Sequence, residues 1–162
     1  MYFFQRIKFL LTATNQHGVH SPFVYAFVTK CLYSKKVFCK SKSLNTAQKT
    51  LAYFNISQIQ TIEKNSALKN QIIKNFPKIG FDYNTTDFVY FEELTENTFK
   101  KITKTSTFHN ESIVFINAIY KDYKNWDQLI KHNAIKVSLD LFYCGILFFR
   151  REQEKEHFKI RI

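Results

Sequence analysis

Glycine is scarce in this sequence. The 162 residues include three glycines, Gly18, Gly80 and Gly145, whereas average usage of about 7 % would give about eleven. Nucleotide-binding motifs such as G-x-G-x-x-G and G-x-x-x-x-G-K-S/T need neighbouring glycines, because the backbone must approach the ligand closely. The three glycines lie far apart along the chain, which excludes both motifs.

Cysteines are few and do not follow a binding pattern. Cys31, Cys39 and Cys144 are odd in number, and no C-x-x-C spacing occurs. Both a disulfide framework and a cysteine-based zinc site are therefore disfavoured. We expect free thiols in a reducing compartment and no metal site.

Long apolar runs are also missing. The longest, Leu141 to Phe149, has about half of the roughly 20 residues that a membrane-spanning helix needs. The first residues, Met1 to Thr14, carry Arg6 and Lys8 inside their apolar stretch and lack a small-residue cleavage site, which is atypical of a secretory signal. These features predict a cytoplasmic protein with no membrane span.

Acidic residues are absent from the first 49 positions, although the chain as a whole has a net charge of +11. This segment holds eight basic residues: Arg6, Lys8, Lys30, Lys35, Lys36, Lys40, Lys42 and Lys49. Clustered lysines attract nucleic acid or anionic lipid. A general bias toward Lys, Asn, Ile and Phe explains the charge equally simply, and no nucleic-acid-binding motif is present, so we do not expect nucleic acid as a partner.

Hydrophobic residues are plentiful. They make up 45 % of the chain, with 17 % aromatic residues, which is enough to build one packed core without disulfide or metal support. We expect a single domain over residues 1–162, with a helical N-terminal cap over 1–55 and an α/β core over 56–162.

The N-terminal cap begins with an amphipathic pattern. Over Met1 to Thr12, apolar residues recur at helical spacing at Phe3, Phe4, Ile7, Leu10 and Leu11. We expect this stripe to pack on the domain or on a partner copy. A membrane-surface helix is the alternative. It is less favoured because the segment has only two positive charges and no tryptophan.

The remaining pattern alternates strands with helices, which predicts a mostly parallel sheet covered on both faces. Ser21-Pro22 begins a helix that runs to about Tyr33, and another helix spans Asn45 to Phe54. The short Tyr143-Cys144-Gly145 connection predicts an antiparallel C-terminal edge. The expected strands are Ile59 to Ile62, Lys78 to Phe81, Phe88 to Phe91, Ile113 to Ile116, Lys136 to Phe142, Gly145 to Phe149 and His157 to Ile162, and the expected helices between them are Asn65 to Phe76, Thr95 to Thr103 and Tyr123 to His132.

Two groups of polar residues are candidates for chemistry. His17 and His20 stand three residues apart in a loop before Ser21, where they either face a ligand or hydrogen-bond local backbone. Glu63, Glu92 and Asn117 each follow an expected strand. Because ligands of parallel sheets sit outside the carboxyl ends of the strands, these side chains could meet a ligand there, although solvated acids fit the residues as well.

Several segments resemble a bacterial family of class I SAM-dependent methyltransferases similar to O-methyltransferases. Residues 13–25 (ATNQHGVHSPFVY) and 148–160 (FFRREQEKEHFKI) resemble the two ends of that family. Between them, 60–63 (QTIE) resembles its second strand with a ribose-binding acid, 86–92 (TDFVYFE) resembles its Y-D-L-I-Y-F-D strand, and 112–119 (SIVFINAI) resembles the strand that follows. The resemblance implies a reduced Rossmann-like, methyltransferase-type fold.

The departures from the family concern its cofactor site. The family's first strand, its glycine-rich E-I-G-x-x-x-G-type loop and the next helix are missing, because Tyr53-Phe54 runs almost directly into the segment that resembles the second strand. An aspartate pair of the family is replaced by Asn117-Ala118, whereas Glu92 keeps a carboxylate. We expect the loss of the loop to weaken SAM binding heavily.

The resemblance implies two alternative functions. In the first, SAM is the cofactor, Glu63 holds its ribose, Glu92 and Asn117 lie near a small hydroxyl acceptor, and His17, His20 and Ser21 cap the site. In the second, the chain is an inactive remnant that acts as a binding or dimerisation module, with itself or with an intact paralogue. If the remaining strands close the gap, the strand ending at Glu63 should lie directly beside the strand ending at Glu92.

Overall fold

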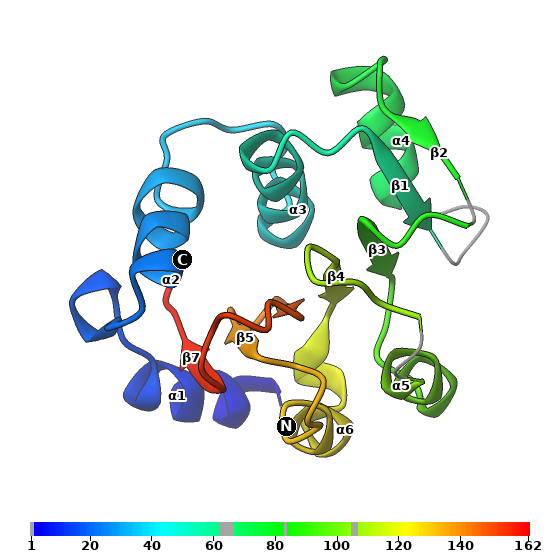
Figure 1. Ribbon diagram of the computed structural model, residues 1–162. Helices are drawn as coiled ribbons and strands as arrows, with labels where there is room; N and C mark the ends of the chain where they lie inside the picture. Colours follow the sequence, from blue (N-terminus) through cyan, green and yellow to red (C-terminus); the bar gives the residue numbers. More distant parts are fainter. Residues whose placement is uncertain (1, 62–66, 83, 105–106) are drawn as a thin grey trace.

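A seven-stranded sheet forms the centre of the molecule (Figure 1). The computed structural model describes residues 2–61, 67–82, 84–104 and 107–162. The strand order is β2-β1-β3-β4-β6-β5-β7. The strands are β1 (Gln58–Thr61), β2 (Gly80–Phe81), β3 (Phe88–Phe91), β4 (Ile113–Asn117), β5 (Val137–Asp140), β6 (Cys144–Phe148) and β7 (Glu156–Lys159). This α/β architecture is compatible with a Rossmann-like fold.

Strands β1 and β3 are direct neighbours. They pair in parallel, with Gln60 opposite Val89 and Thr61 opposite Tyr90. Strand β2 pairs in parallel with β1 on one side, and β4 pairs in parallel with β3 on the other. The prediction that these two strands lie directly side by side is therefore confirmed.

Helices cover both faces of the sheet, as the alternating pattern predicts (Figure 1). One layer holds α2 (Pro22–Phe27), η2 (Val28–Leu32), α3 (Lys42–Tyr53) and α4 (Ala67–Asn75), whose apolar residues share a core with Phe88, Tyr90 and Phe115. The other layer holds α5 (Glu96–Thr103) and α6 (Tyr123–Leu129), which pack on the alternate residues Val89 and Val114. The buried strands alternate between the two cores because successive side chains point to opposite faces.

The second helix changes its hydrogen-bonding pattern along its length. Ser21 accepts a hydrogen bond from the backbone N–H of Val24, and Pro22 occupies the first turn, so the predicted helix start is confirmed. After Phe27 the helix continues as a π-helix to Leu32, where the sequence pattern suggests one uniform helix.

The C-terminal edge is partly as predicted. Strand β6 is antiparallel to both β4 and β5, which confirms the hairpin. Strand β7 is parallel to β5, so the prediction of an antiparallel pairing there is wrong. The reason is that β6 inserts between β4 and β5, which leaves the far side of β5 for β7.

Helix α1 (Tyr2–Thr12) contacts η3 (Ile119–Lys121), where the rings of Tyr2 and Tyr120 meet edge to face. Its buried residue is Phe9, which packs with Ala13 against Phe142. The predicted stripe does not face the domain: Phe3, Phe4, Ile7, Leu10 and Leu11 are 40–81 % exposed. The expectation that this stripe packs on the domain is therefore wrong, because the inner contact uses the opposite side of the helix.

In the part of the chain that the structure describes, no helix is both long enough and apolar enough to cross a bilayer.

Candidate functional site

A cavity of about 480 Å³ opens at the carboxyl end of β4. Asn117 and Ala118 contribute to it from the end of the strand, and Ser41 and Lys42 contribute from the first turn of α3. Tyr143, in the β5–β6 turn, completes the wall. The site thus combines residues from three separate parts of the chain at the sheet edge where parallel strands normally bind ligands.

Glu92 and Asn117 come together at this edge. The side-chain amide of Asn117 donates a hydrogen bond of 3.2 Å to Oε1 of Glu92, so these two candidate residues are in contact. The next residue, Glu93, pairs with Lys121 at 2.5 Å, and Lys121 also lines the cavity. The ion pair raises the pKa of Lys121, mainly through its hydrogen bond to Glu93.

The backbone after Asn117 turns sharply. Ala118 has a φ of 53°, in the left-handed region that favours glycine, and its N–H donates to the carbonyl of Tyr143 at 2.8 Å. This turn leads into η3 (Ile119–Lys121), which brings Tyr120 and Lys121 to the cavity. The side chain of Ala118 is a buried methyl group that offers no hydrogen bond.

Asp140 is a buried carboxyl at the end of β5. Its Oδ1 accepts hydrogen bonds from the backbone N–H of Phe142 at 2.8 Å and from the Tyr123 hydroxyl at 3.3 Å. Its Oδ2 is buried and has no hydrogen-bond partner among the described residues. Burial raises the pKa of Asp140 to about 6, although the Phe142 N–H and Lys159 act in the opposite direction.

Of the remaining predicted site residues, the three that the structure describes, His17, His20 and Ser21, are not brought to this cavity. Glu63 lies outside the described residues, so its ribose-binding role stays a prediction. His17 and His20 are exposed, and the backbone N–H of His17 donates to Oδ1 of Asn15. Ser21 caps α2 and donates a hydrogen bond of 3.2 Å to Oε1 of Gln153.

Because Ser21 is hydrogen-bonded to Gln153, it lies at the edge of the sheet opposite to the cavity at the end of β4. The end of β6, Phe148, pairs with Ile113 at the start of β4, so the segment after β6 lies at the amino ends of the parallel strands. The Arg150 guanidinium lies 4.6 Å from the ring centroid of Phe23 in the same region. The two terminal motifs that carry the family resemblance therefore contact each other, away from Glu92 and Asn117.

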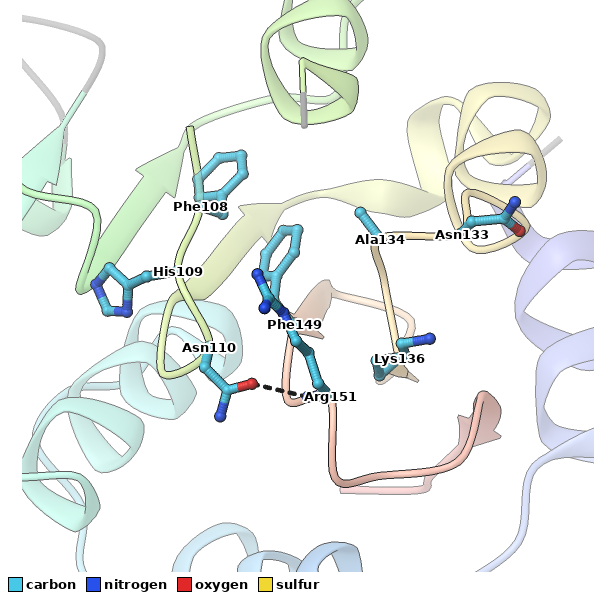
Figure 2. A pocket seen from close by; sticks show the side chains of 8 residues that line it. All are labelled: Phe108, His109, Asn110, Asn133, Ala134, Lys136, Phe149 and Arg151. Atoms are coloured by element: carbon cyan, nitrogen blue, oxygen red, sulfur yellow. Dashed lines mark hydrogen bonds between the residues drawn. The ribbon is translucent and has the colours of Figure 1, made fainter. Parts of the chain in front are cut away.

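A second cavity, of about 430 Å³, lies at that amino edge (Figure 2). The rings of Phe108 and Phe149 stack there with centroids 4.6 Å apart. Lys136 and Arg151 add positive charge, and the Arg151 backbone N–H donates to Oδ1 of Asn110 at 2.8 Å. The sequence pattern did not single out this cavity, because its lining residues come from three loops that are distant in the chain.

All three glycines lie within the described residues and adopt negative φ. A side chain at Gly18 would meet Thr14, one at Gly80 would meet Gln58, and one at Gly145 would meet the ring of Trp126. A protein side chain therefore lies where the Cβ of each glycine would be.

Comparison with known proteins returned no match to a family model, to a curated protein or to a solved structure. Among the described residues, no group of three or more His, Cys, Asp or Glu side chains is placed to hold a metal ion.

Proposed function

We propose that this chain is a methyltransferase-like protein that no longer binds SAM and that acts as a non-enzymatic binding module. The strand order supports the claim that the chain is methyltransferase-like. Dinucleotide-binding α/β sheets run in the order 3-2-1-4-5, and the series β2-β1-β3-β4 reproduces this order with strand 1 absent. The segments that resemble the family's second, fourth and fifth strands are β1, β3 and β4.

The main support for the proposed loss of SAM binding is the direct pairing of β1 with β3. The strand that should bear the glycine-rich loop has no place between them, and the neighbouring strands occupy its hydrogen-bonding positions. The three glycines lie far apart in the chain, and a Cβ at each would meet Thr14, Gln58 or Trp126, so none of them belongs to a second glycine-rich loop. The residues present therefore do not fit the methionine half of SAM.

The acceptor side of the family site is changed as well. Glu92 engages the Asn117 amide, and Glu93 engages Lys121, so both carboxylates at the end of β3 have protein partners. Ala118 supplies no polar group. The cavity retains lysine, serine and tyrosine side chains, which suit a small anionic molecule better than a methyl donor with a positive sulfonium.

Calorimetric titration with SAM and with its demethylated product tests the proposal. We expect no binding heat at millimolar ligand. Thermal melting gives an independent readout: a dissociation constant of about 10 µM would stabilise the protein by about 2.7 kcal/mol at 1 mM ligand and raise its melting temperature by about 5–10 °C. We expect a shift below about 1 °C.

Micromolar binding would overturn the proposal and restore the alternative, in which SAM donates a methyl group to a small hydroxyl acceptor. The variants Glu63→Gln and Glu96→Gln provide a matched comparison for that outcome, because Glu96 is an exposed acid in the first turn of α5. SAM held through its ribose would bind Glu63→Gln more weakly and Glu96→Gln normally. A cooperative melting transition of the unliganded chain confirms that the tested protein is folded.

A further inference from the structure

We propose that α1 docks this protein onto an anionic lipid surface. The helix presents two apolar sides. Tyr2 and Phe9 pack against Phe142 and hold the helix on the domain. The residues of the predicted stripe, Phe3, Phe4, Ile7, Leu10 and Leu11, lie on another side and remain open to solvent.

The side chains of the stripe are more exposed than is usual for a cluster of apolar residues on a globular domain. Phe3 is 66 % exposed, Phe4 75 % and Leu11 81 %. The stripe is continuous, because residues three, four and seven positions apart lie on the same side of a helix. Single exposed apolar residues are ordinary, but a contiguous patch with polar borders marks an interaction surface.

The charges that border the stripe are positive. Arg6 and Lys8 are exposed on α1 itself, and no acidic residue occurs in the first 49 positions. Arg6 and Leu10, one turn apart, line a small cavity together with Lys42 and Arg161. The Arg6 and Lys42 cations lie 5.9 and 5.2 Å from the ring centroid of Tyr143. Basic side chains beside an apolar helix face match lipid headgroups above acyl chains.

A second copy of the chain fits this surface less well. Two α1 helices placed face to face would bring Arg6 and Lys8 of both copies together with no acidic partner on either helix. The stripe offers five side chains, whereas a stable interface uses about 20–30 residues on each side. A bilayer needs no matching surface, and its negative charge complements both cations.

Vesicle co-sedimentation of the full chain tests this inference. We expect the protein to bind vesicles of phosphatidylcholine mixed with phosphatidylglycerol, to bind pure phosphatidylcholine at least tenfold more weakly, and to dissociate as salt rises. Lys8→Gln should weaken binding to the mixed vesicles about fivefold, as expected for one basic residue near the surface. The double variant Phe4→Ser/Leu11→Ser should reduce it at least tenfold.

Helix α4, which packs beside β1 and β2 at the other end of the sheet, supplies the matched controls. Ile73 is 57 % exposed and Lys74 is exposed, so Ile73→Ser and Lys74→Gln remove the same chemistry at a distance from α1. Both should bind vesicles like the unaltered chain, and all variants should melt at similar temperatures because the changed residues are exposed.

Absence of vesicle binding, equal binding to both vesicle types, or equal loss in the α4 variants would each overturn the inference. Light scattering that shows a dimer disrupted by Phe4→Ser/Leu11→Ser, with no vesicle binding, would identify a second copy as the occupant instead. None of these results depends on SAM, so the failure of this inference is separate from failure of the proposed function.

Discussion

Replacing Gly145 by alanine tests whether this glycine is retained for packing. Gly145 lies in β6, opposite Ile116 and Asp140, and a Cβ there would meet the outer ring carbons of Trp126. It would also lie 3.1 Å from Cγ2 of Ile119. Gly145 has negative φ, so the substitution introduces no backbone strain.

The expected cost follows from the rigidity of the neighbours. Trp126 is fully buried, so its ring cannot move into solvent as an exposed side chain would. Overpacking of a dense core costs about 1–3 kcal/mol. At a loss of about 2 kcal/mol, the melting temperature of a chain of this size should fall by about 4–8 °C. Urea denaturation should show the same loss of free energy of unfolding.

Gly80→Ala is the matched control. It makes the same change in strand β2, but its Cβ would meet the end of the exposed Gln58 side chain, which can move aside. We expect no loss, or a gain of up to about 1 kcal/mol from the restricted unfolded chain. Equal stability of the Gly145→Ala and Gly80→Ala variants would refute the packing explanation.

A double variant gives a second test of the same contact. Trp126→Phe removes the outer ring carbons that face Gly145. It also removes a buried indole N–H that has no hydrogen-bond partner within the described residues. The double variant Gly145→Ala/Trp126→Phe should lose less free energy of unfolding than the two single variants together, by at least about 1 kcal/mol. Strict additivity would show that the two positions do not press on each other.

Three further outcomes are expected. Because burial raises the pKa of Asp140 to about 6, the folded chain binds a proton more tightly than the unfolded chain, and stability falls as pH rises from about 4 to about 6. Relative to Asp140→Asn, the unaltered chain should therefore be about 2 kcal/mol more stable at pH 4 than at pH 7 in urea denaturation, and a pH-independent difference would contradict the assignment. Ser21→Ala should cost about 1 kcal/mol by chemical denaturation through loss of the α2 cap, and Ser21→Thr should retain most of it, whereas an equal loss in both would argue against capping. In the folded protein a thiol reagent should label Cys39 first, since burial raises the pKa of Cys31 to about 12 and also raises that of Cys144; rapid labelling of all three would contradict this burial.

Much of the candidate site could be predicted locally. Strands β3 and β4 are short runs of buried residues, and polar side chains follow each of them, so the meeting of Glu92 and Asn117 follows from parallel pairing alone. Lys42 and Tyr143 could not be predicted in the same way. Their approach to the cavity depends on how α3 and the β5–β6 turn pack on the sheet, which no local pattern encodes.

The sequence by itself determined the alternation of strands and helices, the absence of a glycine-rich loop and the start of α2 at Ser21, because periodicity, glycine placement and capping are local properties. Only the tertiary structure decided that β1 closes against β3, that β7 joins β5 in parallel and that the outer stripe of α1 stays exposed. An amphipathic pattern states that a face is apolar but not what covers it. For α1 the inner contact uses Tyr2 and Phe9 against Phe142, and the larger apolar face stays exposed.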